Sequence, residues 1–277
     1  MEKLVTSNLK LGIIAGGQLG KMLIQEASKW DIFTYVLDKD ENCPAGEIAS
    51  YYVKGDNINY DDVYNFGKGL DVVTYEIENI NIKALHRLKA EGVKVLPDPE
   101  ILEMVQDKGL QKNFYYENQI PTSPYKLYSG KDEILKAIEN REIQYPFVQK
   151  LRQGGYDGRG VEVINNEKGI HKLMSGASVI EEKIDIDKEI AIIVARNGRG
   201  DIRCFPAVEM VFDPAANLVD QLLCPSSIDN NTNAEAKIIA SKLVEKMNFT
   251  GLLAIEFFLD KKGNLLVNEV APRPHNS

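Results

Sequence analysis

Two glutamates near the end of the chain, Glu256 and Glu269, are spaced so that they could bind a metal ion together. They lie in the apolar segments "LLAIEFFLD" and "LLVNEVAP", which the turn "KKGN" joins in the pattern of a β-hairpin. If Asp260 pairs with Leu265, the two glutamates face each other on one side of the sheet. Facing carboxylates repel, a divalent cation relieves the repulsion, and oxygen ligands of this kind suit Mg²⁺ that carries phosphates. Asn268 adds an amide ligand or phosphate contact, whereas a register shifted by one residue would leave both glutamates in solvent.

Lys150 ends a short apolar segment and directly precedes a glycine-rich loop, "QGGYDGRG". A lysine in this position can reach phosphates while the loop amides fold over them. The alternative is an ordinary hairpin turn at Asp157 and Gly158, but the loop is longer than a chain reversal requires. Within the loop, Tyr156 offers a ring or hydroxyl to a ring-bearing ligand, and Arg159 offers a bidentate fork to a phosphate or carboxylate.

A second glycine-rich turn, "AGGQLGKM", lies where a strand passes into a helix. Its glycines nearly match the dinucleotide fingerprint, with Ala15 in the first glycine position and Asp38 ending the next strand. NAD, another phosphate-bearing ligand at the helix N-terminus, and a purely structural turn therefore remain alternatives.

Glu76 lies at the carboxyl end of the apolar segment "DVVTYE". Open α/β sheets place ligand contacts at these strand ends, which favours a binding role. The alternative is a polar residue that precedes the helix expected from Ile82.

The last residues, "APRPHNS", combine Arg273, His275 and Asn276 in a segment that two prolines stiffen. Arg273 can balance a small oxyanion, and His275 can stabilise developing charge or transfer a proton. The other two histidines lie on expected helices and carry no such pattern.

The secondary-structure elements that must position these residues show two patterns, one in each half of the chain. From Leu9 to about Leu96, short apolar strands alternate with amphipathic helices from Gln18, near Tyr60 and from Ile82, which predicts a βαβ series with a parallel sheet. A helical connector to about Gln119 follows. From Phe147 onward strands dominate, with one helix over 234–247, which predicts an α+β body with an antiparallel sheet. We expect the strands of this body at 147–151, 161–164, 178–184, 189–195, 202–212, 252–260 and 265–271.

Composition excludes several classes of protein. The chain has 277 residues, a net charge of −8 and 44% hydrophobic residues, which indicates a globular protein of two or three lobes and argues against nucleic acid as a partner. No apolar run is long enough for a membrane span, so we expect no membrane partner and a cytoplasmic location. Three distant cysteines suggest neither disulfides nor a zinc site.

Four motifs together resemble one family. A lysine and a glycine loop over phosphates, followed by a glutamate pair on a later hairpin, is the layout of ATP-grasp enzymes. "GGQLGKM", "DVVTYEIEN", "GGYDGRG" and "NEVAPRPHNS", in this order, resemble the 5-(carboxyamino)imidazole ribonucleotide synthetases, ATP-dependent carboxylases of purine biosynthesis, over the whole chain.

The resemblance implies an ATP-grasp fold, with α/β and α+β parts and an N-terminal Rossmann-like pre-ATP-grasp domain. It implies domains at 1–98, 99–183 and 184–277, the last one truncated before a further C-terminal segment that carries basic residues for the substrate phosphate. We also expect a homodimer whose partners are the small molecules ATP, bicarbonate and 5-aminoimidazole ribonucleotide, with Mg²⁺ as cofactor.

The same resemblance assigns roles to single residues. It places ATP against Lys108, Lys150, Gly155, Tyr156, Asp157, Gly158, Arg159, Gly160, Glu181, Glu182, Lys183, Ile184, Glu189, Asn268 and Glu269. It places the aminoimidazole nucleotide against Gln18, Leu19, Glu76, Tyr156 and Arg159, Mg²⁺ against Glu256 and Glu269, and the bicarbonate chemistry at Arg273, His275 and Asn276.

Three other functions stay open at this point. A formate-dependent glycinamide ribonucleotide transformylase belongs to the same superfamily, but it has a serine-rich lid loop and "PHDT" in place of "GGYDGRG" and "PHNS". An NAD-dependent oxidoreductase would explain Asp38 and the first glycine turn, but it would leave Lys150 and the glutamate pair without a role. A nucleotide-binding module without catalysis is the third alternative.

Overall fold

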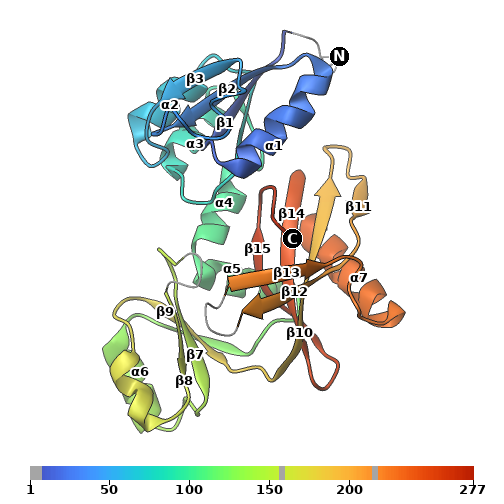
Figure 1. Ribbon diagram of the computed structural model, residues 1–277. Coiled ribbons are helices and arrows are strands. Elements are labelled where there is room, and N and C mark those ends of the chain that lie inside the picture. The colour runs from blue at the N-terminus through green and yellow to red at the C-terminus, as the bar shows by residue number, and fades with distance from the viewer. Residues whose placement is uncertain (1–7, 156–159, 214–217) are drawn as a thin grey trace.

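Three β-sheets form the body of the protein, and each has its own hydrophobic core (Figure 1). The structure is a computed structural model of the chain, and it describes residues 8–155, 160–213 and 218–277. Within these ranges no helix combines the length and the apolar character that crossing a membrane requires.

The N-terminal sheet is parallel, as predicted, with the strand order β3-β2-β1-β4-β5. Its strands are β1 Lys10–Ile14, β2 Phe33–Asp38, β3 Tyr51–Lys54, β4 Val72–Tyr75 and β5 Lys94–Val95, and its helices are α1 Gln18–Ala27, a short 3₁₀ turn Ser28–Trp30, α2 Tyr60–Gly67 and α3 Ile82–Ala90. The sheet is covered on both faces, since Ile13 and Ile14 lie in two different hydrophobic clusters. The edge strand β3 is absent from the predicted elements because its side chains are mostly exposed and show no apolar run.

Two helices lead from this sheet to the rest of the molecule (Figure 1). They are α4 Pro99–Gln106 and α5 Lys108–Glu117, where the sequence predicts one helical connector. Asp107 separates them because its backbone is extended while its side chain caps α5 through the amides of Gly109 and Leu110. Tyr115 of α5 is fully buried in the core of the large sheet described below, so α5 is anchored there.

The small sheet is antiparallel, with the order β6-β9-β7-β8. It contains β6 Tyr125–Tyr128, β7 Phe147–Leu151, β8 Val161–Ile164 and β9 Ser178–Glu182, and it packs against α6 Lys131–Glu139 and the 3₁₀ segment Glu167–Lys172. The helix α6 is not among the predicted elements; it buries only Ile134 and Ala137.

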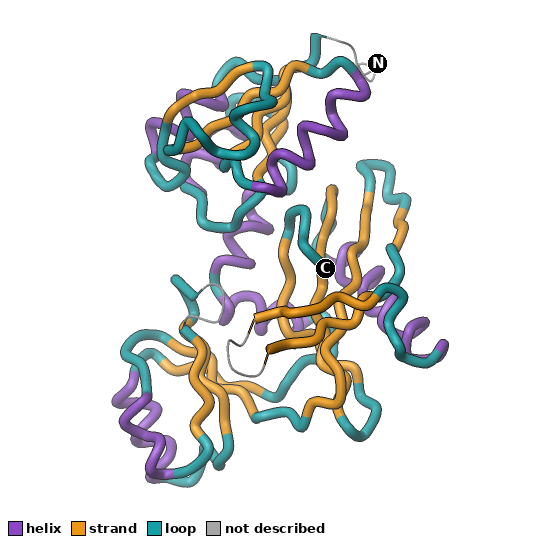
Figure 2. The backbone as a smooth tube through the Cα atoms, viewed as in Figure 1, coloured by secondary structure: helices purple, strands orange, loops and turns teal. Residues whose placement is uncertain are grey.

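The large sheet follows the order β13-β12-β10-β14-β15, with β11 paired to β10 (Figure 2). Its elements are β10 Ile186–Arg196, β11 Ile202–Cys204, β12 Val208–Asp213, β13 Leu218–Leu223, α7 Asn230–Lys246, β14 Gly251–Asp260 and β15 Leu265–Ala271. The strand predicted over 202–212 is wrong in one respect: it is two strands, because the segment between β11 and β12 contains Pro206, which has no amide to donate. The helix α7 begins earlier than predicted because Asp229 caps it through the amides of Asn231 and Thr232.

Candidate functional site

The predicted pairing of Glu256 with Glu269 is confirmed in the β14–β15 hairpin. The register assumed at the turn is wrong, because Leu265 pairs with Leu259 rather than Asp260. A β-bulge between Glu256 and Phe257 corrects the offset, and it leaves Asn268 as the unpaired extra residue on β15. Bulges re-aim side chains next to binding sites, and this one places the Asn268 amide oxygen 2.8 Å from Lys150 Nζ.

The two carboxylates differ in their electrostatic surroundings. Lys108 Nζ lies 2.6 Å from Glu269 Oε2, and its charge lowers the pKa of Glu269 to about 2 against the opposing effect of burial. Burial raises the pKa of Glu256 to about 7, and the charges of Glu269 and Glu189 add to this effect. Lys108 also favours the charged form of Glu256, but burial and the two neighbouring carboxylates outweigh its effect there.

This donor set fits a divalent cation that arrives with phosphates. Glu256, Glu269 and Asn268 supply hard oxygen donors, and Glu256 is a carboxylate in need of positive charge. Within the described ranges, no three His, Cys, Asp or Glu side chains gather as they would to hold a metal ion by themselves. Ligands from a bound phosphate would have to complete the coordination.

Three lysines from α5 and β7 lie near one another beside this hairpin, and two of them contact it. Lys108 contacts Glu269, while Lys150 contacts Asn268 and also lies 3.0 Å from Glu181 Oε1. The third, Lys112, was not among the predicted residues; its Nζ lies 3.3 Å from the same Glu181 oxygen. The spacing of Lys108 and Lys112 could have indicated it, because residues four apart share one face of a helix.

An ion pair that the sequence analysis did not identify joins the start of α5 to the end of β7. Arg152 donates from Nε and Nη2 to the two oxygens of Asp107, at 2.8 and 2.7 Å. The amide of Lys108 also donates to the carbonyl of Arg152, at 2.9 Å. Gly109 allows this packing, since a Cβ there would lie 2.6 Å from Arg152 Nε. The pair fixes Lys108 relative to Lys150, two residues before Arg152.

The glycine-rich loop begins directly after Arg152. Gly154 and Gly160 have φ values of 77° and 76°, the left-handed region that glycine adopts most readily. The amide of Leu151 donates to the carbonyl of Gly160, so the two ends of the loop meet. Gly155 is described as well, but the predicted ligands Tyr156, Asp157, Gly158 and Arg159 lie outside the described residues.

The segment predicted to hold adenine begins in β9. Glu181 is buried and faces the two lysines, whereas Glu182 and Lys183 are exposed and Ile184 is half-buried. Glu189, the predicted ribose ligand, lies on β10 with a pKa that burial raises to about 7. Glu181 and Glu189 lie near Lys150, but the roles assigned to this segment remain predictions.

Glu76 contacts the first glycine turn rather than α3. Its carboxylate accepts hydrogen bonds from the amides of Gly17 and Gly20 at the start of α1, and a Cβ at Gly17 would collide with it. The amide of Gly16 donates to Asp38 at 2.7 Å, so the acidic residue of the dinucleotide fingerprint is already engaged within the turn. The two predicted substrate ligands of this turn lie beside Glu76 at the first turn of α1, where Gln18 is exposed and Leu19 is half-buried.

The segment after β15 connects the large sheet with the N-terminal sheet. Arg273 Nε donates to Glu78 Oε1 at 2.8 Å, in the loop that follows β4. His275 Nε2 lies 3.7 Å from Glu256 Oε1. Burial lowers the pKa of His275 to about 4, assisted by the charge of Arg273, so the imidazole is neutral at neutral pH. Asn276 is exposed.

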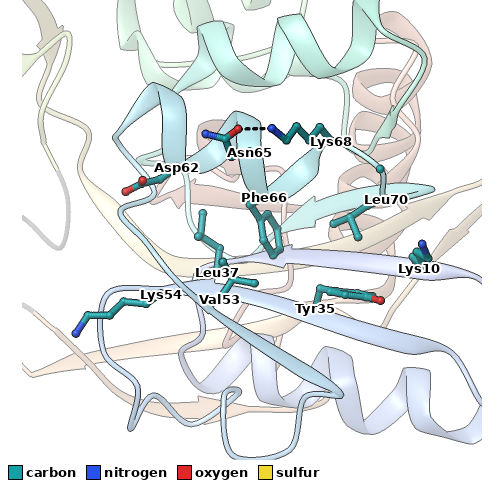
Figure 3. A pocket seen from close by; sticks show the side chains of 11 residues that line it. Lys10, Tyr35, Leu37, Val53, Lys54, Asp62, Asn65, Phe66, Lys68 and Leu70 are labelled. Carbon is teal, nitrogen blue, oxygen red and sulfur yellow. Dashed lines mark hydrogen bonds between the residues drawn. The ribbon is translucent and has the colours of Figure 1, made fainter.

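A separate hollow of about 410 Å³ lies on the N-terminal sheet, between α2 and strands β1 to β3 (Figure 3). Its three lysines, Lys10, Lys54 and Lys68, point in different directions, and Lys68 is bonded to Asn65 at 2.6 Å. Because its cations do not converge, we do not regard it as the candidate site.

Comparisons with known proteins agree with this geometry. Residues 9–106 match the ribonucleotide synthetase preATP-grasp domain, and residues 113–277 match the ATP-grasp domain. The N5-carboxyaminoimidazole ribonucleotide synthase of Staphylococcus aureus is 36% identical in an alignment of 274 residues that covers 96% of this chain and 71% of that protein.

Solved structures give the same result. The Thermotoga maritima N5-carboxyaminoimidazole ribonucleotide synthetase has a TM-score of 0.86 at 40% identity, covering 97% of this chain and 69% of that one. The Aspergillus clavatus synthase in complex with ADP and 5-aminoimidazole ribonucleotide has a TM-score of 0.86 at 27% identity, covering 98% and 71%. The predicted fold class is confirmed, and the chain belongs to the N5-carboxyaminoimidazole ribonucleotide synthase family of ATP-grasp carbon–nitrogen ligases.

Proposed function

We propose that this chain catalyses the ATP-dependent carboxylation of 5-aminoimidazole ribonucleotide with bicarbonate, giving N5-carboxyaminoimidazole ribonucleotide, ADP and phosphate. Family membership favours this function over the transformylase and oxidoreductase alternatives. The observation that carries the proposal is the convergence of Lys108 and Lys150 on the hairpin that holds Glu256, Asn268 and Glu269.

In this proposal, Lys108 and Lys150 bind the phosphates of ATP, because both ammonium groups reach the hairpin from different elements. The glycine-rich loop 153–160 covers the phosphates with its amides. The backbone of residues 181–184 holds adenine, because the Glu181 side chain faces Lys112 and Lys150 instead. Glu189 accepts hydrogen bonds from the ribose hydroxyls once it is ionised.

We assign Mg²⁺ to Glu256 and Glu269, with phosphate oxygens as further ligands. Bound there, Mg²⁺ would neutralise charge on the phosphates of ATP as the terminal phosphoryl group is transferred. Its proposed ligands are also the residues whose mutual repulsion it would relieve.

The protein's part in the reaction begins with bicarbonate. Arg273 and Asn276 hold its oxygens, one of which attacks the γ-phosphorus of ATP and displaces ADP to give carboxyphosphate. The C–O bond to the phosphoryl group then breaks, releasing phosphate and CO₂. The exocyclic amine of the ribonucleotide attacks the carbon of CO₂ and loses a proton, which the neutral imidazole of His275 can accept.

The acceptor nucleotide lies at the other end of this site. We assign its recognition to Gln18, Leu19 and Glu76 at the start of α1, together with Tyr156 and Arg159 of the glycine-rich loop. The ion pair between Arg273 and Glu78 supports this assignment, because it brings the bicarbonate residues to the edge of the N-terminal sheet that carries Glu76. The domain boundaries at 98 and 183, a homodimer and a cytoplasmic location are further proposals.

The test is Lys150→Ala, with the exposed helix residue Lys246→Ala as the matched control. Losing one charge-assisted phosphate contact, about 1.5–3 kcal/mol, should weaken Mg-ATP binding by about 10- to 100-fold in isothermal titration. ADP release by the parent should require both bicarbonate and 5-aminoimidazole ribonucleotide. Unchanged ATP affinity in Lys150→Ala, or ADP release that ignores the ribonucleotide, would contradict the proposal.

A further inference from the structure

Lys112 is a buried cation with no role in the proposed reaction. It is 2% exposed, and its ammonium donates to Thr122 Oγ1 at 2.6 Å and lies 3.3 Å from Glu181 Oε1. Burial lowers its pKa to about 8, which leaves it mostly charged at pH 7. An ammonium so enclosed cannot itself contact a nucleotide, so its function must act through its neighbours.

Glu181 connects Lys112 to the phosphate site. The carboxylate is 3% exposed, and one oxygen, Oε1, lies within ion-pair distance of both Lys112 and Lys150. Although burial opposes ionisation, the charges of Lys150 and Lys112 keep the pKa of Glu181 below its usual range. Two cations therefore share one carboxylate, and the three groups together carry one net positive charge.

That surplus charge decides how strongly Lys150 can attract a phosphate. When a buried carboxylate has a single cation as its partner, the carboxylate cancels the charge of that cation, because charges interact strongly where water is excluded. If Lys112 were absent, Glu181 would neutralise Lys150 and compete with ATP for its ammonium. With Lys112 present, the Glu181 charge is already balanced.

The surrounding backbone holds this arrangement in place. Thr122 Oγ1 accepts from Lys112 and donates to the carbonyl of Val267 at 2.7 Å. Val267 directly precedes Asn268, whose amide oxygen is the other partner of Lys150. Both neighbours of Lys150, Glu181 and Asn268, are thus connected to Lys112.

We propose that Lys112 is a positioning residue for ATP: by balancing Glu181, it leaves the charge of Lys150 available to the nucleotide phosphates. The inference rests on the proposed function, in which Lys150 binds ATP phosphates. It also predicts that the Glu181 side chain weakens ATP binding by competing for Lys150, rather than strengthening ATP binding by a contact with adenine.

A double-mutant cycle tests this charge balance, with isothermal titration of Mg-ATP at pH 7 as the readout. The variants are Lys112→Met, Glu181→Gln and their combination, with Lys150→Met and the exposed Lys246→Met as references. Thermal unfolding and circular dichroism report whether each variant is folded. Met and Gln keep approximate side-chain volume while removing charge.

We expect Lys112→Met to weaken Mg-ATP binding about tenfold, since much of one charge-assisted contact is lost. Glu181→Gln should bind ATP at least as tightly as the parent, because it removes the carboxylate that competes with ATP for the Lys150 ammonium. The double variant restores one net positive charge, so its affinity should return to within about threefold of the parent. A purely structural role for Lys112 would give no such rescue.

The failures are distinguishable. If Lys150→Met binds Mg-ATP as the parent does, the phosphate site of the proposed function is wrong. The positioning role is tested once Lys150→Met is shown to bind Mg-ATP weakly. Any one of three results then overturns it: parental affinity in Lys112→Met, an affinity of Glu181→Gln as weak as that of Lys112→Met, or a double variant whose affinity is not restored. Should Lys112→Met not fold, the double variant decides: parental affinity supports the inference, and a tenfold loss refutes it.

Discussion

Replacing each glutamate of the hairpin pair should change stability in opposite directions. Like-charge repulsion alone predicts that both Glu256→Gln and Glu269→Gln leave the metal-free protein equally or more stable. The structure changes this expectation for one of them, because Lys108 pairs with Glu269 at 2.6 Å, while no cation among the residues that the structure describes lies so close to Glu256.

The magnitude for Glu256 follows from its pKa of about 7 against an ordinary 4.5. A carboxyl whose pKa is raised by folding binds more protons in the folded state, so its penalty is absent at low pH and grows as pH rises from about 4.5 to 7. The 19% exposed side chain makes solvent screening a small correction. Glu256→Gln should therefore stabilise the protein by up to about 3 kcal/mol at pH 8, and by less than about 1 kcal/mol at pH 5.

For Glu269 the sign is reversed. Its pKa of about 2 means that the folded state favours the carboxylate, and this contribution is present above pH 4.5 and is lost as pH falls toward 2. Because 42% of the side chain is exposed, solvent screens the pair, and we expect Glu269→Gln to cost only about 1–2 kcal/mol at pH 8.

The assay is thermal unfolding in chelator at pH 5 and pH 8, with the exposed helix residue Glu245→Gln as control. At about 2–4 °C per kcal/mol, Glu256→Gln should unfold up to about 6–12 °C above the parent at pH 8. Both hairpin variants should lose turnover. A Glu256→Gln protein no more stable than the parent at pH 8, or equally stabilised at both pH values, would refute the assigned electrostatics.

Three further outcomes test how the site is held. Arg152→Met should destabilise the protein by about 3 kcal/mol in urea unfolding, because it leaves buried Asp107 without its bidentate partner, and Mg-ATP affinity should fall with it; unchanged stability would contradict this. Glu76→Gln should weaken the binding of 5-aminoimidazole ribonucleotide in titrations at saturating Mg-ATP while ATP affinity stays constant, since the change is confined to the glycine turn, which loses one of its two carboxylate acceptors; a loss of ATP affinity instead would contradict that separation. Gly67→Ala should cost about 1–3 kcal/mol without altering ATP affinity, because the added Cβ would collide with Leu88 Cδ1 in the N-terminal core; a neutral result would mean that Leu88 moves away freely.

The sequence predicts well whatever depends on local periodicity. The two apolar segments on either side of "KKGN" predict the hairpin and the facing of Glu256 and Glu269. It does not predict the bulge at Asn268, because nothing local distinguishes that residue from one in a regular ladder.

Long-range partners are the part that the sequence could not supply. Glu181 lies in an apolar strand and resembles an exposed polar position until β7 and α5 bring Lys150 and Lys112 to it. Glu76 is similar, since its acceptor role depends on glycine amides some sixty residues earlier in the chain. In both cases the neighbouring sequence is compatible with two roles, and only the contacts made in the folded protein distinguish them.

The ion pair between Lys108 and Glu269 bears on how ATP could bind without a large desolvation cost. Each member is the proposed partner of a charged ligand, an ATP phosphate for Lys108 and Mg²⁺ for Glu269. Binding would then exchange one partner for another of the same sign, and neither side chain would be left without a counter-charge while the ligand excludes water from the site, which is the costly state. Lys150 makes a similar exchange easier, because its Asn268 contact is to a neutral amide and Lys112 already balances its carboxylate neighbour. The site therefore keeps its cations in place beforehand while leaving their charge available, which is the condition for strong electrostatic stabilisation of phosphoryl transfer.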